Sequence, residues 1–245
     1  MCYALPLGEG MISTGLEAAV FGVIFDNDGV LVDTEAFSEA AYCTALAEQG
    51  VQADPADAAR YCGLTDADIL RDLESRMAMR LDFERFSSRK RDLYFDAARH
   101  KAMRVFPGVR TLLDQLKREQ VPIALASSAP RDKIEFNLAE SGLAGYFGEV
   151  VSGEDFVRGK PDPEIFLTSA RQIGVPAARC IVFEDSINGL KAARSAGMLA
   201  VGVSNTFPVK DLQPFADEVL TTLENITVEH IAHWMRERLA TANRV

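Results

Sequence analysis

Two aspartates, Asp26 and Asp28, follow an apolar run near the start of the chain, within the stretch FDNDGVLVDTE of residues 25–35. Alternate residues of extended backbone project to the same side, about 6–7 Å apart, so both carboxylates face one small volume. Such a pair offers hard oxygen ligands to Mg2+. Beside a bound phosphate, one carboxylate can act as a nucleophile while the other transfers protons. The competing interpretation is a simple turn, because Asp, Asn and Gly are turn residues.

Thr34 and its two acidic neighbours end the same stretch. Asp33 or Thr34 fits the N-cap of a helix that begins at residue 35, and Glu35 would interact favourably with the dipole of that helix. We therefore expect these three residues to organise the point where the chain leaves its first strand.

Two serines, Ser127 and Ser128, lie in the stretch ALASSAP of residues 124–130, between an apolar run and a helix expected from Arg131. Hydroxyls and backbone amides at a helix N-terminus suit the oxygens of a phosphate group. Taken alone, however, the stretch is more typical of a helix cap.

A lysine, Lys160, stands before Pro161 in the stretch RGKPDPEIF. The proline favours extended backbone at Lys160, from which its ammonium group could bridge a phosphate and nearby carboxylates. A single lysine is more often a solvated surface residue. A phosphate-binding P-loop is excluded, because five residues separate Gly153 from Gly159 and Pro161 stands where that motif requires Ser or Thr.

A second pair of acids, Glu184 and Asp185, follows the apolar run of residues 180–183, and Ser186 opens the next predicted helix. Each acid alone fits an N-cap equally well. The conjunction of all these groups decides between the interpretations. They follow different predicted strands, so a parallel sheet brings them to one edge, where unpaired carboxylates would raise one another's pKa values. A divalent cation together with a lysine relieves that repulsion, and we predict a metal–phosphate site.

Short apolar runs that alternate with helical patterns must position these groups. The predicted strands are residues 20–25, 121–126, 149–152, 180–183 and 199–203. The predicted helices of the same part are residues 108–119, 131–141, 162–173, 186–196 and 228–240. Nearly continuous hydrophobicity indicates strands buried on both faces, and the alternation predicts right-handed βαβ units. The fold class is therefore α/β, with a doubly wound parallel sheet.

One interval, residues 35–103, contains no convincing strand and is too long for a simple crossover. Its predicted helices are residues 36–49, 66–79 and 83–99. We expect a helical cap domain here, at the edge of the sheet where open α/β folds bind ligands. The catalytic core would comprise residues 20–34 and 104–245, and residues 1–19 would form a loosely ordered extension.

The composition excludes several classes of protein. The 245 residues carry a formal net charge of −10 and the sequence pI is about 4.9, which argues against partners such as nucleic acid or an anionic membrane. No run approaches the length of a membrane span, and the N-terminus lacks the basic region of a signal peptide. The four cysteines lie far apart, which is typical of reduced thiols in a cytoplasmic protein. The three histidines show no metal-ligand spacing.

The acidic, serine and lysine motifs, in this order, resemble those of the haloacid dehalogenase superfamily, in particular its phosphatases and mutases with a helical cap after the first strand. The likeness covers about residues 20–220, and the motifs correspond to DNDGVLVDTE, Ser127, Lys160 and EDS. It implies a Rossmann-like core, Mg2+ as cofactor and a small phosphorylated substrate. Dehalogenation itself is not implied, because it needs neither the metal nor the second acid.

The resemblance also implies a role for each matching residue. Asp26 would attack phosphorus and form an aspartyl-phosphate, and Asp28 would act as general acid and base. The implied metal ligands are Asp26, Asp28 (through its backbone carbonyl), Glu184 and Asp185. The implied phosphate-binding residues are Asn27, Ser127, Ser128 and Lys160.

Substrate choice is expected from the cap. The stretch YCGLTDADIL of residues 61–70 looks like the specificity loop of these enzymes, with Gly63 and Thr65 as candidate substrate residues and Lys90 as a third on a following helix. The structural alternatives are a helix start at Thr65 and a solvated helix face around Lys90.

Two cap positions favour a phosphatase over a mutase. The related β-phosphoglucomutases carry an arginine that grips a second phosphate, and here the matching residue is Asp66. Their cap histidine matches Ser38. A mutase of sugar phosphates is the alternative, and a phospho-aspartate signalling module is the alternative outside enzymes, although such a module needs no cap. The sequence leaves the substrate and the oligomeric state open, and a monomer is compatible with it.

Overall fold

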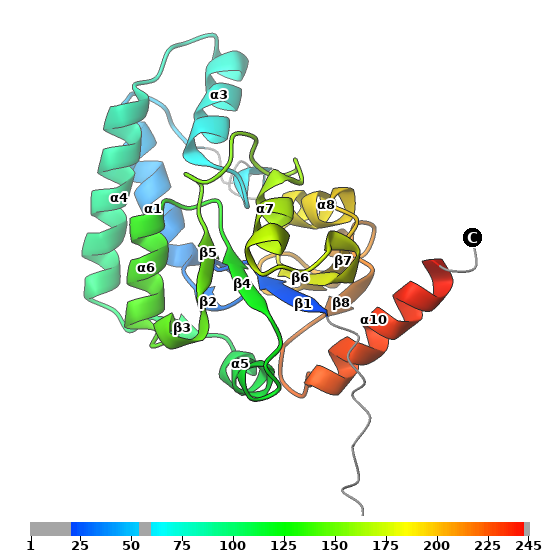
Figure 1. Cartoon of the computed structure of the whole chain (residues 1–245). Helices are drawn as coiled ribbons and strands as arrows, with labels where there is room; N and C mark the ends of the chain where they lie inside the picture. The colour runs from blue at the N-terminus through cyan, green and yellow to red at the C-terminus, as the bar shows by residue number, and fades with distance from the viewer. Residues whose placement is uncertain (1–20, 54–59, 243–245) are drawn as a thin grey trace, which may run out of the picture.

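The computed structural model describes residues 21–53 and 60–242, and its centre is a six-stranded sheet in the order β5-β4-β1-β6-β7-β8 (Figure 1). Every neighbouring pair in this sheet is parallel. The strands are β1 (Gly22–Phe25), β4 (Ile123–Ala126), β5 (Glu149–Val151), β6 (Cys180–Glu184), β7 (Leu199–Val203) and β8 (Glu218–Leu220). The predicted α/β fold class with a doubly wound sheet is confirmed.

The register of the sheet brings the ends of its central strands to one level. Phe25 of β1 lies opposite both Leu125 of β4 and Phe183 of β6. The residues that follow these three positions therefore emerge at the same carboxyl edge, where open parallel sheets bind their ligands.

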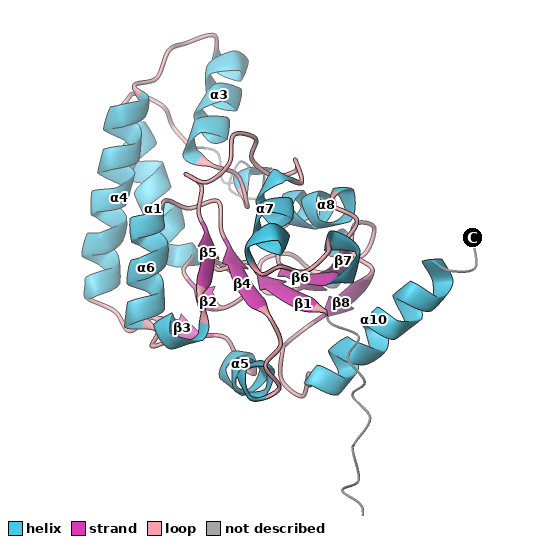
Figure 2. Ribbon diagram, in the orientation of Figure 1, coloured by secondary structure: helices cyan, strands magenta, loops and turns pink. Residues whose placement is uncertain are grey.

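Helices cover both faces of the sheet (Figure 2). They are α5 (Val109–Arg118), α6 (Arg131–Glu140), α7 (Glu164–Gln172), α8 (Ile187–Ser195), α9 (Val209–Leu212) and α10 (Val228–Ala242). Alternate residues of β1 enter different apolar clusters: Val23 and Phe25 join the one that includes Leu112 of α5, and Ile24 joins the one that includes Phe166 of α7. This explains the unbroken hydrophobicity of the strand, since both of its faces are buried.

A separate group of helices follows β1: α1 (Glu35–Ala47), α3 (Asp66–Met77) and α4 (Phe83–Arg99). These helices share an apolar cluster of their own, which includes Tyr42, Leu46, Leu70, Leu73 and Phe86. A small core of this kind lets the segment pack as a unit. We call residues 35–103 the cap. The boundaries themselves stay a prediction.

The two segments that connect the cap to the sheet pair with each other, and neither of these short strands was predicted. Strand β2 (Val32–Asp33) runs antiparallel to β3 (Arg104–Val105), and the amide of Phe106 donates to the carbonyl of Leu31 at 3.0 Å. Two-residue strands carry too little periodic pattern to be recognised in a sequence.

The predicted strands and helices are otherwise present. Strands β1, β4 and β5 are shorter than predicted, β7 has the predicted bounds, and β6 extends one residue further, to Glu184. The prediction missed β8 and the short helix α9. Helix α3 stops at Met77, two residues early, because Ala78 takes a left-handed conformation with φ of 50°. The predicted extension of residues 1–19 lies outside the described residues. Among the described helices none is long and apolar enough to cross a membrane.

Candidate active site

Lys160 lies at the centre of the carboxyl edge. Its Nζ donates hydrogen bonds to Asp26 Oδ1 at 2.6 Å and to Glu184 Oε2 at 2.8 Å, and its side chain is 0% exposed. The loop after β5 delivers it, and its ammonium group also lies 5.3 Å from the ring of Phe166. The alternative of a solvated surface lysine is therefore wrong, and this residue neutralises part of a buried acidic cluster.

Three buried carboxylates surround this position. Asp26, Glu184 and Asp185 each offer an oxygen, and these oxygens lie within 4.8 Å of one another. Burial and the charge of Glu184 raise the pKa of Asp26 to about 8, although Lys160 opposes the shift. Burial and the charges of Glu184 and Asp26 raise the pKa of Asp185 well above its usual value. One lysine does not balance three acids, and a set of hard oxygen donors fits Mg2+.

The excess negative charge of this cluster should make the stability of the protein depend on pH and on Mg2+. The folded protein holds the Asp26 proton up to a pH of about 8, whereas the ordinary value for the carboxyl is 3.8. Because the folded state binds more protons in this window, the free energy of unfolding of the metal-free protein should fall as the pH rises from about 4 to about 8. Mg2+ should therefore raise the Tm more at about pH 8 than at about pH 6, where protons compete with it.

Thermal unfolding with a chelator and with Mg2+ measures this effect. The Asp26→Asn variant is the control, since it lacks the shifted group and should show a shallower decline. A decline of the same slope in both proteins would assign the pH dependence to other groups.

Local hydrogen bonds orient Glu184, the last residue of β6, and Asp185, which follows it. The amide of Ser186 donates to Glu184 Oε1 at 3.1 Å, and the Ser186 hydroxyl donates to the same oxygen. The hydroxyl of Thr206 donates to Asp185 Oδ2. Thr206 was not among the predicted site residues, although it follows β7 as the other candidates follow their strands. Applying the same rule to the stretch SNT of residues 204–206 would have identified it.

Asp28 stands apart from the three-acid group and has partners of its own. Its Oδ1 accepts hydrogen bonds from the Thr34 hydroxyl and lies 3.1 Å from Lys133 Nζ, while its Oδ2 accepts from Asn27 Nδ2 at 3.3 Å. Burial opposes ionisation of Asp28, but Lys133 and Thr34 outweigh it and lower its pKa. The predicted metal contact of Asp28 uses its backbone carbonyl, and that contact stays a prediction.

Three of the predicted phosphate-binding residues, Asn27, Ser127 and Ser128, have hydrogen bonds to other parts of the protein. The side chain of Asn27 is directed to Asp28, and its Oδ1 has no hydrogen-bond partner within the described residues. Ser127 is buried, and its hydroxyl accepts from the amide of Ala129 at 3.2 Å. Ser128 donates its hydroxyl to the carbonyl of Gly63 at 2.7 Å, across to the cap. Their roles toward phosphate stay predictions.

The cap loop around Gly63 closes over the acidic cluster. Asn188 of α8 donates to the carbonyl of Cys62 at 3.2 Å. A Cβ atom added to Gly63 would lie 2.5 Å from Ser186 Oγ and 3.7 Å from the Lys160 side chain. Gly63 also has φ of 81°, a conformation that favours glycine. The glycine therefore permits the close approach of cap to core.

Replacing Gly63 by alanine should force the loop away from the site. We expect kcat/KM to fall about ten- to hundredfold, since small displacements of this kind misalign reacting groups. Gly50→Ala is the matched control, because Gly50 has a similar φ of 79° and nothing within 4 Å of an added Cβ. Both variants carry the same backbone strain, so equal activities would show that contact with Ser186 does not matter.

The remaining cap candidates pair within the cap. Thr65 caps α3 by accepting from the amide of Asp68 at 3.2 Å, which confirms the predicted helix start. Lys90 forms an ion pair with Asp66, and their side chains are only 22% and 13% exposed. Lys90 therefore does not belong to a solvated helix face. The charge of Lys90 is largely neutralised by Asp66, the residue that matches the arginine of the mutases.

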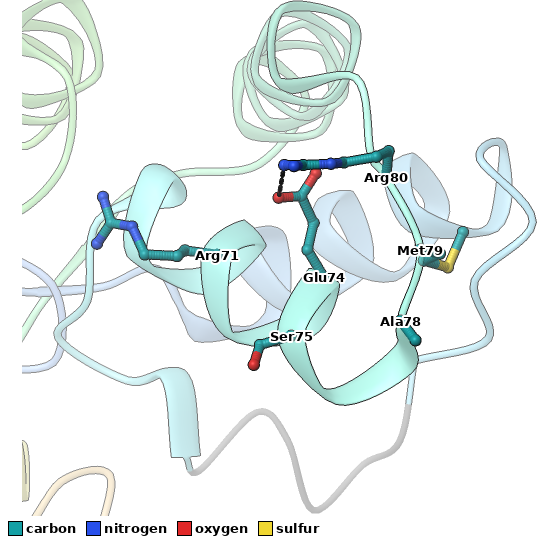
Figure 3. Close-up of a pocket in the computed structure, with 6 residues that line it drawn as sticks. All are labelled: Arg71, Glu74, Ser75, Ala78, Met79 and Arg80. Carbon is teal, nitrogen blue, oxygen red and sulfur yellow. Dashed lines mark hydrogen bonds and ion pairs between the residues drawn. The ribbon is translucent and has the colours of Figure 1, made fainter.

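A concavity of about 440 Å³ elsewhere on the cap is not part of this site. Figure 3 shows that it lies beside the end of α3, where Glu74 pairs with Arg80 at 3.4 Å. Its lining residues are Arg71, Glu74, Ser75, Ala78, Met79 and Arg80. None of the predicted catalytic or phosphate-binding residues is among them.

The family model described as "Haloacid dehalogenase-like hydrolase" matches residues 23–203, which include both acidic pairs and Lys160. The chain belongs to this family. The match begins in β1 and ends in β7, so it spans the cap together with most of the sheet.

Curated relatives support this assignment. It is 32% identical over 90% of its length to SUPPRESSOR OF QUENCHING 1 of Arabidopsis thaliana, of which it spans 21%. It spans little more than half of two further Arabidopsis relatives, at 57% and 56% of their lengths. Similarity extends over 81% of a phosphorylated carbohydrates phosphatase of Thermotoga maritima, at 33% identity over 72% of the chain. It extends over 96% of the β-phosphoglucomutase of Bacillus subtilis, at 31% identity over 89% of the chain.

A solved structure supports the fold. A β-phosphoglucomutase of Clostridium difficile superposes with a TM-score of 0.81 at 24% identity, over 90% of this chain and 99% of that one.

Proposed function

We propose that this protein is a Mg2+-dependent phosphatase of small phosphorylated metabolites that works through an aspartyl-phosphate on Asp26. The observation that carries the proposal is the burial of Lys160 between Asp26 and Glu184, beside Asp185. A buried, oriented carboxylate next to a lysine and a potential metal site has the surroundings that phosphoryl transfer needs.

The reaction has two balanced halves. In the first, an Asp26 oxygen bonds to phosphorus, the bond to the leaving oxygen breaks, and Asp28 supplies a proton to that oxygen. In the second, water attacks phosphorus, Asp28 accepts a proton from the water, and the bond between phosphorus and Asp26 breaks. The lowered pKa of Asp28 keeps its carboxylate ionised and so available to accept the proton of the water in the second half. The first half needs the protonated form of Asp28, which Lys133 and Thr34 disfavour. Lys160 and Ser127 would hold the phosphoryl group throughout.

The cofactor would be held by the carboxylates of Asp26, Glu184 and Asp185, with the backbone carbonyl of Asp28 as a further ligand. When bound, Mg2+ supplies positive charge that offsets the charge of the phosphoryl oxygens and of Asp26. Thr206 and Ser186 would keep two of these acids in place through the hydrogen bonds described above.

A sugar-phosphate mutase is the second candidate, and the similarity to the β-phosphoglucomutase of Bacillus subtilis favours it. The pairing of Lys90 with Asp66 argues against it, because a mutase must hold a second phosphate and these residues offer almost no net charge for one. A phospho-aspartate signalling module would not need the cap loop over the site.

The free thiols of Cys43, Cys62 and Cys180 agree with a cytoplasmic protein.

Phosphate release across a panel of sugar and nucleotide monophosphates, with and without Mg2+, tests the proposal. We expect Mg2+-dependent release from one or more monophosphates. Adding a sugar 1-phosphate together with a sugar bisphosphate separates the candidates. An isomerised product without free phosphate would establish the mutase, and a long-lived phosphoprotein without turnover would establish the signalling module.

A further inference from the structure

Lys133 of α6 contacts Asp28 and two residues of the cap, Ser38 and Tyr94. Its Nζ lies 3.1 Å from Asp28 Oδ1, donates to Ser38 Oγ at 3.2 Å and lies 4.5 Å from the centre of the Tyr94 ring. The side chain is only 16% exposed. Neither the family motifs discussed above nor the predicted site included this residue.

The partners of Lys133 come from different parts of the fold. Ser38 belongs to α1 and Tyr94 to α4, both in the cap, whereas α6 packs on the sheet. Figure 1 shows α6 next to these two cap helices. One turn further along α6, Asn137 accepts a buried hydrogen bond from the Tyr94 hydroxyl at 2.7 Å. Lys133 and Asn137 therefore form one face of α6 that receives the cap.

The Asp28 carboxylate depends on few other groups. Thr34 donates to the same oxygen as Lys133, and Asn27 donates to the other oxygen at 3.3 Å. Without Lys133, Oδ1 of Asp28 would keep only the hydrogen bond from the Thr34 hydroxyl. The carboxylate would also lose its link, through Lys133, to Ser38 and Tyr94 of the cap. A fixed direction of this group matters, because proton transfer requires hydrogen-bond reach and alignment.

We propose that Lys133 is a positioning residue that holds the Asp28 carboxylate in its catalytic direction and does so through its simultaneous contact with the closed cap. This inference rests on the proposed function, in which Asp28 activates the water that attacks the aspartyl-phosphate. Lys133 itself touches neither the phosphoryl group nor the metal ligands of the three-acid group in this scheme.

Burst kinetics with p-nitrophenyl phosphate and Mg2+ tests the inference in the whole protein. p-Nitrophenolate departs without a proton, so the first half of the reaction does not need Asp28, whereas the second half does. Lys133→Met should therefore retain a rapid burst of one p-nitrophenolate per enzyme. Its steady-state turnover should fall roughly ten- to hundredfold, a part of the roughly hundred- to ten-thousandfold that a positioned general base contributes.

A second readout is independent of turnover. The intact mass of the Lys133→Met protein should show the phosphoryl adduct accumulating during the steady state. Lys133→Arg keeps a cation at this position and should restore most of the turnover. Lys117→Met is the matched control. Lys117 lies on α5, donates to the carbonyl oxygen of Gly145 at 3.3 Å and lies 5.5 Å from the centre of the Tyr146 ring.

Distinct results overturn the inference and the proposed function. A wild-type protein that hydrolyses p-nitrophenyl phosphate together with an unaffected Lys133→Met variant overturns the inference alone. Equal slowing of the burst and of turnover also overturns it, because that result indicates a purely structural role of Lys133 in holding the cap. A rise in KM with unchanged kcat overturns it too, because that result indicates a contact with the substrate. A wild-type protein that shows no burst and no release from any phosphate ester overturns the proposed function itself.

Discussion

The Asp26→Asn variant is expected to lose phosphatase activity by roughly ten-thousandfold or more, the order seen when a catalytic nucleophile is removed. Asparagine has nearly the same shape and can still accept the hydrogen bond that Lys160 donates to Asp26 at 2.6 Å. Its amide cannot form the acyl phosphate, so the chemistry stops while the geometry is retained. Phosphate release and intact-mass measurement of the phosphoryl adduct would check both parts of this expectation.

The loss in Asp26→Asn should not come from unfolding. Asp26 lies 6% exposed among like charges that raise its pKa, so a neutral side chain should leave the Tm of the metal-free protein equal or higher. Asp211→Asn, an exposed position on α9, is the control for a carboxylate-to-amide change. Turnover at the parent rate in Asp26→Asn would show that another group is the nucleophile.

Lys160→Met is expected to have the second largest effect, on both stability and activity. The ammonium group lies between two buried carboxylates at 2.6 and 2.8 Å. Removing one partner of a buried ion pair typically costs about 3–5 kcal/mol. The loss of a positive charge that would hold the phosphoryl group should lower kcat about a hundred- to thousandfold. Thermal unfolding and steady-state kinetics at saturating Mg2+ would measure these two effects.

Mg2+ should stabilise Lys160→Met more than it stabilises the parent protein, because the variant leaves more negative charge for the metal to neutralise. This dependence identifies the acidic cluster as the place of the effect. Lys191→Met is the matched control, since Lys191 also lies over an aromatic ring, 4.7 Å from that of Phe215, but on the exposed surface of α8. An active, fully stable Lys160→Met protein would contradict the central place given to this lysine.

Much of the fold followed from local patterns in the chain. Apolar runs bounded by helical patterns predicted the central strands, and the strand ends carried polar side chains that a parallel sheet must bring to one edge. The residues Asp26, Lys160 and Glu184 do meet there. This part could be predicted because strand direction alone determines which end of a parallel strand faces the ligand edge.

The side-chain contacts of the cap could not be predicted from local patterns in the sequence. Whether Lys90 faces solvent or Asp66, and whether the Ser128 hydroxyl points to the site or to Gly63, depends on how helices separated by many residues pack. Lys133 is the clearest example, because its position on α6 gave no sign that Asp28 and Tyr94 lie within reach.

The sequence by itself thus determined the type of fold, the acidic edge and the presence of an inserted helical segment. The tertiary structure alone decided which cation meets which carboxylate and how closely the cap lies over the core. The physical reason is that periodicity and strand ends are local properties, whereas ion pairs between distant elements depend on side-chain directions that only the packed chain specifies.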